Sequence, residues 1–339
     1  MLLKTLSELQ GTSGAEKKVR DLLQEEITPY VDSLAVDKIG NLIAVKKGAK
    51  NSPKVLLTAH MDEVALMVTE ITPDGFLKFR PVGGIDPRIL VSKPVKVSGI
   101  NGVIGSKAIH LQKTQERQQA LKLDQLYIDI GANSKEEAER YIKLGDYAYF
   151  VTGFEALGQA FFKGKAFDDR VGCYVIVETL KKRFDNLNLV AAFTVQEEVG
   201  LRGSKVAAYH TQPDFALNIE GTISADMAHI EEEEWVTELG KGPALSIQDQ
   251  TTLYNPLLIK QVVDLAKQNK IPLQFRRGTS GNNDAGKIHS SRTGIPTLSI
   301  NVPCRYIHSP ASMVRQDDIQ NTIQLVEEIL RAIPDHFIF

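Results

Sequence analysis

The chain has 339 residues, an apolar fraction of 42%, a charged fraction of 24% and a formal net charge of −2. This length exceeds that of one typical domain and predicts two. The small net charge gives no sign of a nucleic-acid or membrane partner, because nucleic-acid binders usually carry a basic stripe. The sequence has no run of 18 apolar residues and no N-terminal signal pattern, and its two cysteines, Cys173 and Cys304, are too few for a disulfide scaffold. We therefore expect a soluble cytoplasmic protein with reduced thiols.

The N-terminal part of the chain predicts two helices, two extended segments and a buried strand. Residues 1–29 carry apolar side chains at helical spacing, and TSGAE (12–16) indicates a helix start between them. Extended chain with a turn is expected at 36–45, followed by the apolar strand KVLLTAH (54–60). This strand ends in AHMDE, where His60 and Asp62 lie on one face of extended chain. A metal-binding histidine held by a carboxylate has this pattern, and so does a strand-end salt bridge.

From residue 63 to residue 160 the pattern changes to short alternating apolar runs separated by Gly, Pro and Asn. Evenly spaced runs of this kind predict a small β-barrel or β-sandwich. One helix is expected at 134–145, because Ser134 and Glu137 have the spacing of a capping box. Residues 112–125 are expected to form an exposed loop. The span contains no catalytic cluster and is predicted to be an inserted domain.

After residue 160, apolar strands alternate with amphipathic helices. This alternation predicts an α/β fold in which a mixed, mostly parallel sheet is sandwiched by helices. Strands are expected at 189–195, 215–220 and 297–303, and helices after FDDR (167–170), at 255–270 and at 317–332. Sheets of this class place their chemistry at the carboxyl ends of the strands. Acidic side chains stand at or near those ends, namely Asp168, Glu197, Glu198 and Glu220.

These acids also have a structural explanation. Acids that precede a helix are favoured by capping and by the helix dipole, and Glu197 and Glu198 fit a solvated loop. Neighbouring carboxylates at a buried strand end, however, need a cation or a shared proton. His60 and His308 add imidazole nitrogen, and this mixture of donors suits zinc, cobalt or manganese. The donors exceed the needs of one zinc ion and fit two metal ions that share a bridging carboxylate.

Five motifs occur in a fixed order: AHMDE, FDDRVG, VQEEVGLRG, DAGKIH and RYIHSP. In this order they closely resemble the tetrahedral/glutamyl aminopeptidase family of dinuclear metallopeptidases, over essentially the whole chain. The resemblance implies a catalytic domain of residues 1–62 and 161–339. It implies that residues 63–160 form a β-rich oligomerisation domain, either PDZ-like or a barrel. It further implies short peptide substrates, a homo-oligomer that is commonly a tetrahedral dodecamer, and no nucleic-acid or membrane partner.

The resemblance also assigns roles to the candidate residues. Asp62 and Glu197 would be catalytic, Asp62 by orienting the histidine and Glu197 as the general base. Glu197 would take a proton from a water that bridges two divalent metal ions and deliver it to the leaving amine. A free N-terminus would dock in the site, so that one residue is removed at a time. The metal ligands that the resemblance implies are His60, Asp168, Glu198, Glu220 and His308.

Three assignments stay open at this point. Asp168 is preferred to its neighbour Asp169 because of the motif and not because of chemistry. Many relatives have Asp where Glu220 stands, which moves the carboxylate by one methylene group, so Asp226 is the alternative third acidic ligand. The identity of the native metal is open as well, since geometry and supply decide it more than ligand type.

Two other classes of function fit part of the pattern. One is a metal-dependent glycosidase or deacylase, since some relatives carry an endoglucanase label. Glycosidases, however, normally use two metal-free carboxylates. The other is a non-catalytic shell protein, which predicts the loss of the base or of a ligand, and none is missing. For an aminopeptidase, Arg276, Arg277 and Lys287 border the loop GTSGNNDAG and favour an acidic first residue, unless they form only a solvated basic loop.

Overall fold

The computed structural model describes residues 1–336, and the chain forms two compact units. The sheet unit comprises residues 1–63, residues 154–307 and the chain from residue 312 onward, and the barrel unit comprises residues 64–153 and 308–311. The predicted fold class, an α/β domain with a small inserted β-rich domain, is confirmed. Residues 154–160, which we expected in the inserted domain, belong to the sheet unit because β10 (Glu155–Leu157) pairs with β11 (Phe161–Gly164).

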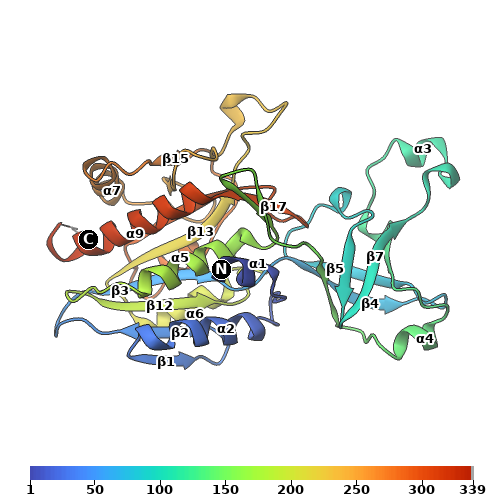
Figure 1. Cartoon of the computed structure of the whole chain (residues 1–339), viewed down its shortest axis with the longest axis horizontal. Helices are drawn as coiled ribbons and strands as arrows, with labels where there is room; N and C mark the ends of the chain where they lie inside the picture. The colour runs from blue at the N-terminus through green and yellow to red at the C-terminus, as the bar shows by residue number, and fades with distance from the viewer. Residues whose placement is uncertain (337–339) are drawn as a thin grey trace. The chain divides into compact units, whose positions relative to one another are not determined.

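The sheet unit is built on one mixed sheet (Figure 1). Its strand order is β1-β2-β12-β3-β13-β16-β17-β11-β10, with β14 pairing to β16 and β15 pairing to β14. The four central strands β12, β3, β13 and β16 are parallel, and antiparallel strands flank them, so the parallel character is concentrated at the centre. The strands not yet defined are β1 (Ser33–Val36), β2 (Leu42–Lys46), β3 (Lys54–His60), β12 (Asn188–Thr194), β13 (Phe215–Ile223), β14 (Ala244–Ser246), β15 (Gln274–Arg276), β16 (Thr297–Arg305) and β17 (Ser312–Arg315).

Helices cover both faces of this sheet, because its central strands are apolar on both sides. On β3, Val55 and Leu57 pack in the larger core with α1, α2, α5, α7 and α9, whereas Leu56 packs in a smaller core with α6 and α8. The sandwich predicted from the sequence is therefore present. The helices are α1 (Leu2–Glu8), α2 (Lys17–Ile27), α5 (Phe167–Leu180), α6 (Arg202–Thr211), α7 (Pro256–Gln268), α8 (Ala285–Ile288) and α9 (Gln316–His336).

The start of α5 differs from the expectation. Asp168 and Asp169 were expected to precede the helix, but they lie in its first turn with non-helical dihedral angles, and a cis peptide bond joins them. The helices predicted at 255–270 and 317–332 are present as α7 and α9. None of the helices within residues 1–336 has the length and apolar character needed to cross a membrane.

The barrel unit contains six antiparallel strands closed in the order β4-β5-β8-β7-β6-β9, so the sequence alternative of a barrel is correct. Leu66 and Phe79 contribute to its apolar core. Ser134 accepts a hydrogen bond from the N–H of Glu137 and starts α4 (Lys135–Glu139), as its spacing predicts, but the helix ends well before residue 145, where we expected its end. Residues 112–125 contain the short helix α3 (Thr114–Arg117) and are largely exposed. The strands are β4 (Ala65–Ile71), β5 (Leu77–Val82), β6 (Pro94–Val97), β7 (Ile100–Ser106), β8 (Leu126–Asp129) and β9 (Tyr147–Phe150).

Candidate metal centre

Five of the predicted site residues meet at the carboxyl ends of the central strands. His60 is the last residue of β3, Glu197 and Glu198 follow β12, and Glu220 lies in β13. Because these strands are parallel neighbours, their carboxyl ends share one edge of the sheet. Asp168 reaches the same place from the first turn of α5.

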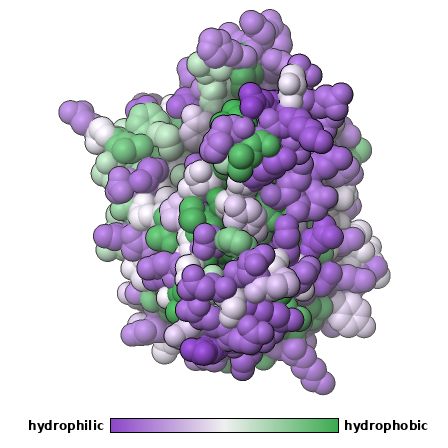
Figure 2. All heavy atoms as spheres, turned by 90° about the vertical axis from the view of Figure 1, so that its right-hand side faces the viewer, coloured by the Kyte–Doolittle hydropathy of each residue, from purple (hydrophilic) through white to green (hydrophobic). Residues whose placement is uncertain are grey.

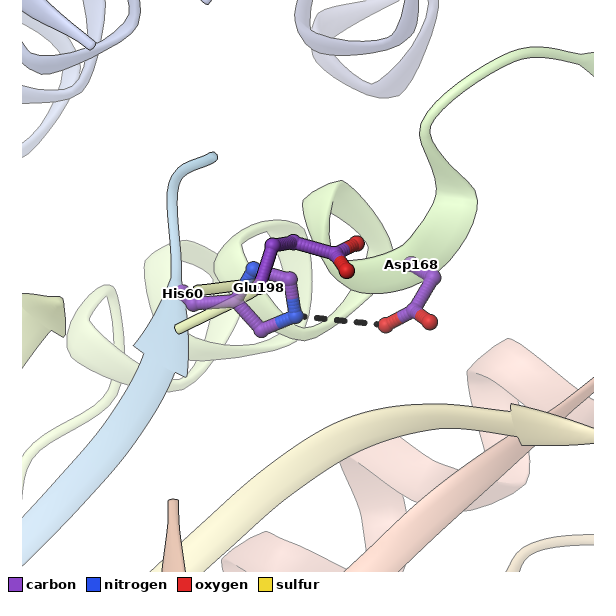
Figure 3. A group of neighbouring side chains, drawn as sticks. All are labelled: His60, Asp168 and Glu198. Carbon is purple, nitrogen blue, oxygen red and sulfur yellow. Dashed lines mark hydrogen bonds and ion pairs between the residues drawn. The ribbon is translucent and has the colours of Figure 1, made fainter. Parts of the chain in front are cut away.

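His60 has several of these carboxylates as neighbours, and Figure 3 shows it beside Asp168 and Glu198. Its Nε2 lies 3.2 Å from Oε1 of Glu220, 3.3 Å from Oδ1 of Asp168 and 3.9 Å from Oε2 of Glu197. Its Nδ1 lies 3.0 Å from the backbone carbonyl oxygen of Asp62. A carbonyl oxygen only accepts hydrogen bonds, so Nδ1 carries a proton. When Nε2 is unprotonated, the imidazole is neutral and can offer this nitrogen to a metal ion.

The cluster contains more carboxylates than cationic groups. Burial alone lowers the pKa of His60, but the carboxylates of Glu197 and Asp168 outweigh burial and raise this pKa well above its ordinary value. Burial, aided by neighbouring carboxylates, raises the pKa of Glu197 well above its usual range and that of Glu220 to about 7. Such carboxyl groups retain protons unless further positive charge compensates them. A divalent cation supplies that charge, so the electrostatics of the cluster fit a metal ion.

The spacing of the donor atoms also fits a metal ion. Among the described residues, two groups of ligand atoms lie within 4.8 Å of one another, His60 with Asp168 and Glu198, and His60 with Asp169 and Glu220. In a tetrahedral site with bonds of about 2.1 Å, two ligand atoms lie about 3.4 Å apart. The separations of 3.2 and 3.3 Å around Nε2 of His60 are close to this value.

The two adjacent aspartates have different surroundings. The carboxylate of Asp169 is fully buried and accepts hydrogen bonds from the backbone N–H groups of His60 at 3.2 Å and Gly172 at 3.0 Å. Its oxygens therefore already support the backbone of β3 and α5. The carboxylate of Asp168 is partly exposed and points toward Nε2 of His60 (Figure 3). These contacts favour Asp168 as the ligand.

Asp226, the alternative acidic ligand, is engaged elsewhere. Its carboxylate accepts hydrogen bonds from Nε of Arg305 at 2.9 Å and from Nη2 at 2.8 Å. Glu220 instead lies beside His60, and Nδ2 of Asn218 donates to its second oxygen, Oε2, at 2.8 Å. The geometry therefore favours Glu220 over Asp226.

His308 lies in the segment 308–311 of the barrel unit. Its Nδ1 is 3.0 Å from the backbone carbonyl oxygen of Gly84, and its backbone φ is 55°. Neither ligand group found among residues 1–336 contains His308. Its role as a metal ligand stays a prediction.

The loop that carries Glu197 and Glu198 is held by side chains from three other segments. Asp62 is fully buried, and each of its carboxylate oxygens accepts one backbone N–H of this glutamate pair. Asp62 therefore contacts the histidine through its backbone oxygen at 3.0 Å and through Oδ1 at 3.6 Å, and its side chain also accepts the glutamate N–H groups. Four successive N–H groups donate to side-chain oxygens: Val195 to Asn41 at 3.0 Å, Gln196 to Glu16 at 3.1 Å, Glu197 to Asp62 at 3.1 Å and Glu198 to Asp62 at 3.2 Å.

Sequence reasoning did not assign Glu16, Asn41 or Asp284 to the site. Glu16 belongs to TSGAE, which we interpreted only as a helix start. Asp284 opens the motif DAGKIH and is fully buried. Its Oδ2 accepts a hydrogen bond from Oγ1 of Thr194 at 2.6 Å, and its Oδ1 has no hydrogen-bond partner among the described residues. The signal for Asp284 is present in the sequence, since an acid stands between a turn-rich loop and apolar helical positions.

Two buried cations fasten the strand end that carries His60. Arg170 donates to the carbonyl oxygen of Met61 at 2.7 Å and to the carbonyl oxygens of residues 6, 9 and 11. Nζ of Lys165 lies 2.7 and 2.6 Å from the two carboxylate oxygens of Glu63. The arginine of FDDRVG and the second acid of AHMDE therefore have structural roles.

Known proteins match the chain over nearly its full length. The M42 glutamyl aminopeptidase family matches residues 40–325. A protein of Acetivibrio thermocellus is 40% identical over 97% of both chains. A lysyl aminopeptidase of Pyrococcus furiosus is 31% identical over 98% of this chain and 96% of its own. A glutamyl aminopeptidase of Lactococcus lactis is 30% identical over 98% of this chain and 95% of its own.

Solved structures agree with these matches. A TET aminopeptidase from a marine-sediment Thaumarchaeota archaeon superposes with a TM-score of 0.95 and 36% identity, covering 98% of this chain and 96% of its own. The TET1 peptidase of Pyrococcus horikoshii, which can assemble into a tetrahedron or a large octahedral shell, has a TM-score of 0.84 and 34% identity over 97% and 98% of the two chains. Because sequence and fold match together along almost the entire chain, it belongs to the M42 family of aminopeptidases, a group of metallopeptidases.

Proposed function

We propose that the protein uses two divalent metal ions, zinc, cobalt or manganese, to release the N-terminal residue of short peptides. The observation that carries this proposal is the convergence of the carboxylates of Asp168, Glu197 and Glu220 on Nε2 of the buried His60, at the carboxyl ends of the central strands. The ions, when bound, supply Lewis-acid activation of the scissile carbonyl and of water. The ligands that we propose are His60, Asp168, Glu198, Glu220 and His308.

Glu197 is the proposed general base. Burial and nearby carboxylates raise its pKa, which brings it toward the range where a carboxylate accepts a proton from water and returns it to the leaving amine. The carboxylate of Asp62 holds Glu197 in place by accepting a hydrogen bond from the backbone N–H of Glu197. The side chain of Glu197 is nearly buried, so water has limited access to the base from bulk solvent.

Metal analysis and a chelator test this proposal. Purified protein should contain two divalent ions per chain and should cleave amino-acid anilides. EDTA should remove this activity, and zinc, cobalt or manganese should restore it. EDTA saturated with zinc before addition cannot take up the bound metal and controls for effects other than metal removal. A metal-free protein with unchanged cleavage in EDTA would contradict the proposal.

We further propose that the enzyme prefers an acidic N-terminal residue and that Arg276 carries this preference. Nε of Arg276 donates to Oγ1 of Thr222 at 3.0 Å. Thr222 follows Glu220 by two residues on β13, so both side chains lie on one face. The guanidinium is therefore beside the candidate metal centre, and a carboxylate that meets it there forms a charge-assisted hydrogen bond.

The two other basic residues of this region are less suitable. Arg277 is 49% exposed, and its Nη2 lies 3.6 Å from Oε1 of Glu238. Lys287 is exposed on α8 and lines a different pocket with Lys205 and Tyr209. The relatives include both a glutamyl and a lysyl aminopeptidase, so membership of the family leaves the preferred residue undetermined.

The preference is tested by the ratio of kcat/KM for Glu-anilide and Leu-anilide. Wild type should favour Glu-anilide, and Arg276→Met should reverse the order. Arg276 also donates to the carbonyl oxygens of Gly278 and Ser280, so its loss could disturb the loop. Such a disturbance lowers both rates, whereas a change in the ratio reports on specificity. Arg277→Met is the matched control, and a wild type that prefers leucine would contradict the proposal.

We also propose a cytoplasmic homo-oligomer, arranged as a tetrahedral dodecamer, with contacts from the barrel unit. Figure 2 shows apolar side chains among hydrophilic ones on one face of the molecule. Exposed apolar side chains support association because they gain from burial against another chain. Both cysteines are free and buried, as suits a reducing compartment. The barrel unit exposes Val103, Ile109, Leu111, Tyr141, Leu144 and Val151.

A further inference from the structure

Ser13 and Glu16 have the spacing of a capping box but do not cap α2. Glu16 occupies the N-cap position, and no side-chain cap hydrogen bond is present there. The same spacing in the barrel unit behaves differently, because Ser134 accepts a hydrogen bond from the N–H of Glu137 and caps α4. The side chains of residues 13 and 16 therefore have other partners.

Those partners lie in the candidate active site. Oε1 of Glu16 accepts hydrogen bonds from the backbone N–H groups of Gln196 at 3.1 Å and Gly14 at 2.8 Å. Oγ of Ser13 donates to Oδ2 of Asp62 at 2.6 Å. Glu16 is 4% exposed and Ser13 is 6% exposed, so water competes little for either contact. Two side chains of one N-terminal turn thus contact the segment that carries Glu197 and Glu198. Glu16 binds the backbone directly before Glu197, and Ser13 binds the carboxylate of Asp62, which accepts the N–H groups of both glutamates.

Glu16 binds the backbone of Gln196, the residue directly before the proposed base Glu197. Gln196 has a φ of 56°, in the left-handed region that L-residues adopt rarely. The N–H of Gln196 donates to the side chain of Glu16. The carbonyl oxygen of Gln196 accepts a hydrogen bond from the N–H of Arg202 at 3.2 Å. Because hydrogen bonds hold both the N–H and the carbonyl group of Gln196, the backbone that leads into Glu197 has a fixed direction. The side chain of Glu197 is oriented accordingly.

The contact of Ser13 acts through Asp62. The carboxylate of Asp62 accepts the N–H groups of Glu197 and Glu198, one on each oxygen. The hydroxyl of Ser13 binds the same carboxylate and limits its rotation. Removal of that hydroxyl loosens the acceptor on which both glutamates depend.

We infer that Ser13 and Glu16 are positioning residues for the base Glu197, and this inference rests on the proposed function. Their contacts with Asp62 and with the backbone of Gln196 place both residues behind the proposed base, so they act through other groups. Their effect is on turnover, because a displacement of a catalytic group by about 1 Å can lower a rate roughly 100-fold.

Paired substitutions test this role. Glu16→Ala should lower kcat roughly 10- to 100-fold with little change in KM, whereas Glu16→Gln, which keeps an acceptor oxygen, should retain most of the turnover. Ser13→Ala should lower kcat to a smaller extent, and Ser13→Thr should restore it. The content of bound metal, measured by elemental analysis, should equal that of wild type in all four variants.

Hydrogen exchange supplies a readout that does not depend on activity. The amides of residues 196–198 should exchange faster in Glu16→Ala and Ser13→Ala, in metal-free protein as well. Ser134→Ala, which removes a true helix cap, is the matched control and should lower the melting temperature without changing kcat or these amides.

The outcomes separate this inference from the proposed function. A wild type without aminopeptidase activity would refute both. An active wild type with an equally active Glu16→Ala would refute the positioning role alone. The role would also be refuted if turnover fell in proportion to lost metal, or if Glu16→Gln were as impaired as Glu16→Ala.

Discussion

At the residue scale, the partner of each carboxylate distinguishes acids that stabilise the fold from acids that are candidates for metal binding or catalysis. Glu63 is paired with Lys165, and Asp226 is paired with Arg305. Glu220, in contrast, lies in a buried cluster whose nearest cationic group is the shared imidazole of His60. A buried carboxylate with a full cation partner keeps its charge without a metal ion, and one without such a partner favours metal binding.

Substitution of the proposed base, Glu197, tests its role. Glu197→Gln keeps the shape of the side chain but cannot accept a proton, so turnover should fall roughly 100-fold or more. Metal content and melting temperature should stay at the wild-type values. Glu198→Gln is the matched neighbour and should lose metal together with activity. Near-normal turnover in Glu197→Gln would assign the base to another residue.

The ion pair of Asp226 with Arg305 should appear in the dependence of stability on pH. Burial raises the pKa of Asp226, but the hydrogen bonds from Arg305 and Ser224 outweigh burial and lower it below 3.8. The pair therefore stabilises the fold above the unfolded pKa, and this stability is lost as the pH falls through the lower folded pKa. Asp226→Asn should cost about 1.5–3 kcal/mol at pH 7. Urea unfolding should show this difference shrinking below pH 4, and a difference independent of pH would contradict the assignment.

At the element scale, the carboxyl ends of the strands are joined by buried polar contacts as well as by sheet pairing. The segment after β3 is tied to the segment after β11 through Glu63 and Lys165. Arg170 on α5 ties the same segment to α1 and to the chain that follows α1. These contacts keep the end of β3 in place against α5, and this arrangement brings His60 and Asp168 together.

Removal of one buried partner should therefore destabilise the sheet unit. Lys165→Met leaves the buried Glu63 with only the more distant Arg170, whose Nη2 lies 3.7 Å from Oε1, and should cost about 3 kcal/mol, the lower end of the range for a broken buried pair. The double variant Lys165→Met with Glu63→Gln removes both charges and should be less destabilised than Lys165→Met alone. Urea unfolding of the two variants measures the difference. Equal stability of wild type and Lys165→Met would show that the pair contributes little.

At the scale of the whole molecule, the two units have separate cores and separate proposed tasks. The sheet unit holds the proposed catalytic base and most of the candidate ligands, and the barrel unit presents exposed apolar side chains such as Ile109 and Leu111. The structural boundary falls after Glu63 and before Phe154. This boundary keeps Glu63 with its partner Lys165, so it is the appropriate limit for a deletion.

The proposed assembly predicts a change in particle size. Replacement of residues 64–153 by a Gly-Ser linker should give smaller particles than wild type by light scattering. Ile109→Asp with Leu111→Asp should have a similar effect, because charges at an apolar contact oppose its burial. Leu253→Asp is the control, since Leu253 is 75% exposed in the sheet unit. A wild type that is monomeric at micromolar concentration would contradict the assembly.

The sequence by itself determined the class of the fold and the candidates for the site. The apolar runs at 54–60 and 189–195 became β3 and β12 with little change, because hydrophobic periodicity is a local property. The order of the five motifs identified the family for the same reason, since each motif is a short local pattern. Glu197 and Glu220 were recognisable as acids at or near the ends of apolar runs.

Only the tertiary structure decided which partners the polar side chains have. The spacing of Ser13 and Glu16 is that of a helix cap, yet both side chains bind segments that are distant in the sequence. Asp168 and Asp169 are neighbours in the chain, but one points toward Nε2 of His60 and the other binds backbone N–H groups. A hydrogen bond requires two groups within about 3 Å, and which groups come that close depends on how distant segments pack.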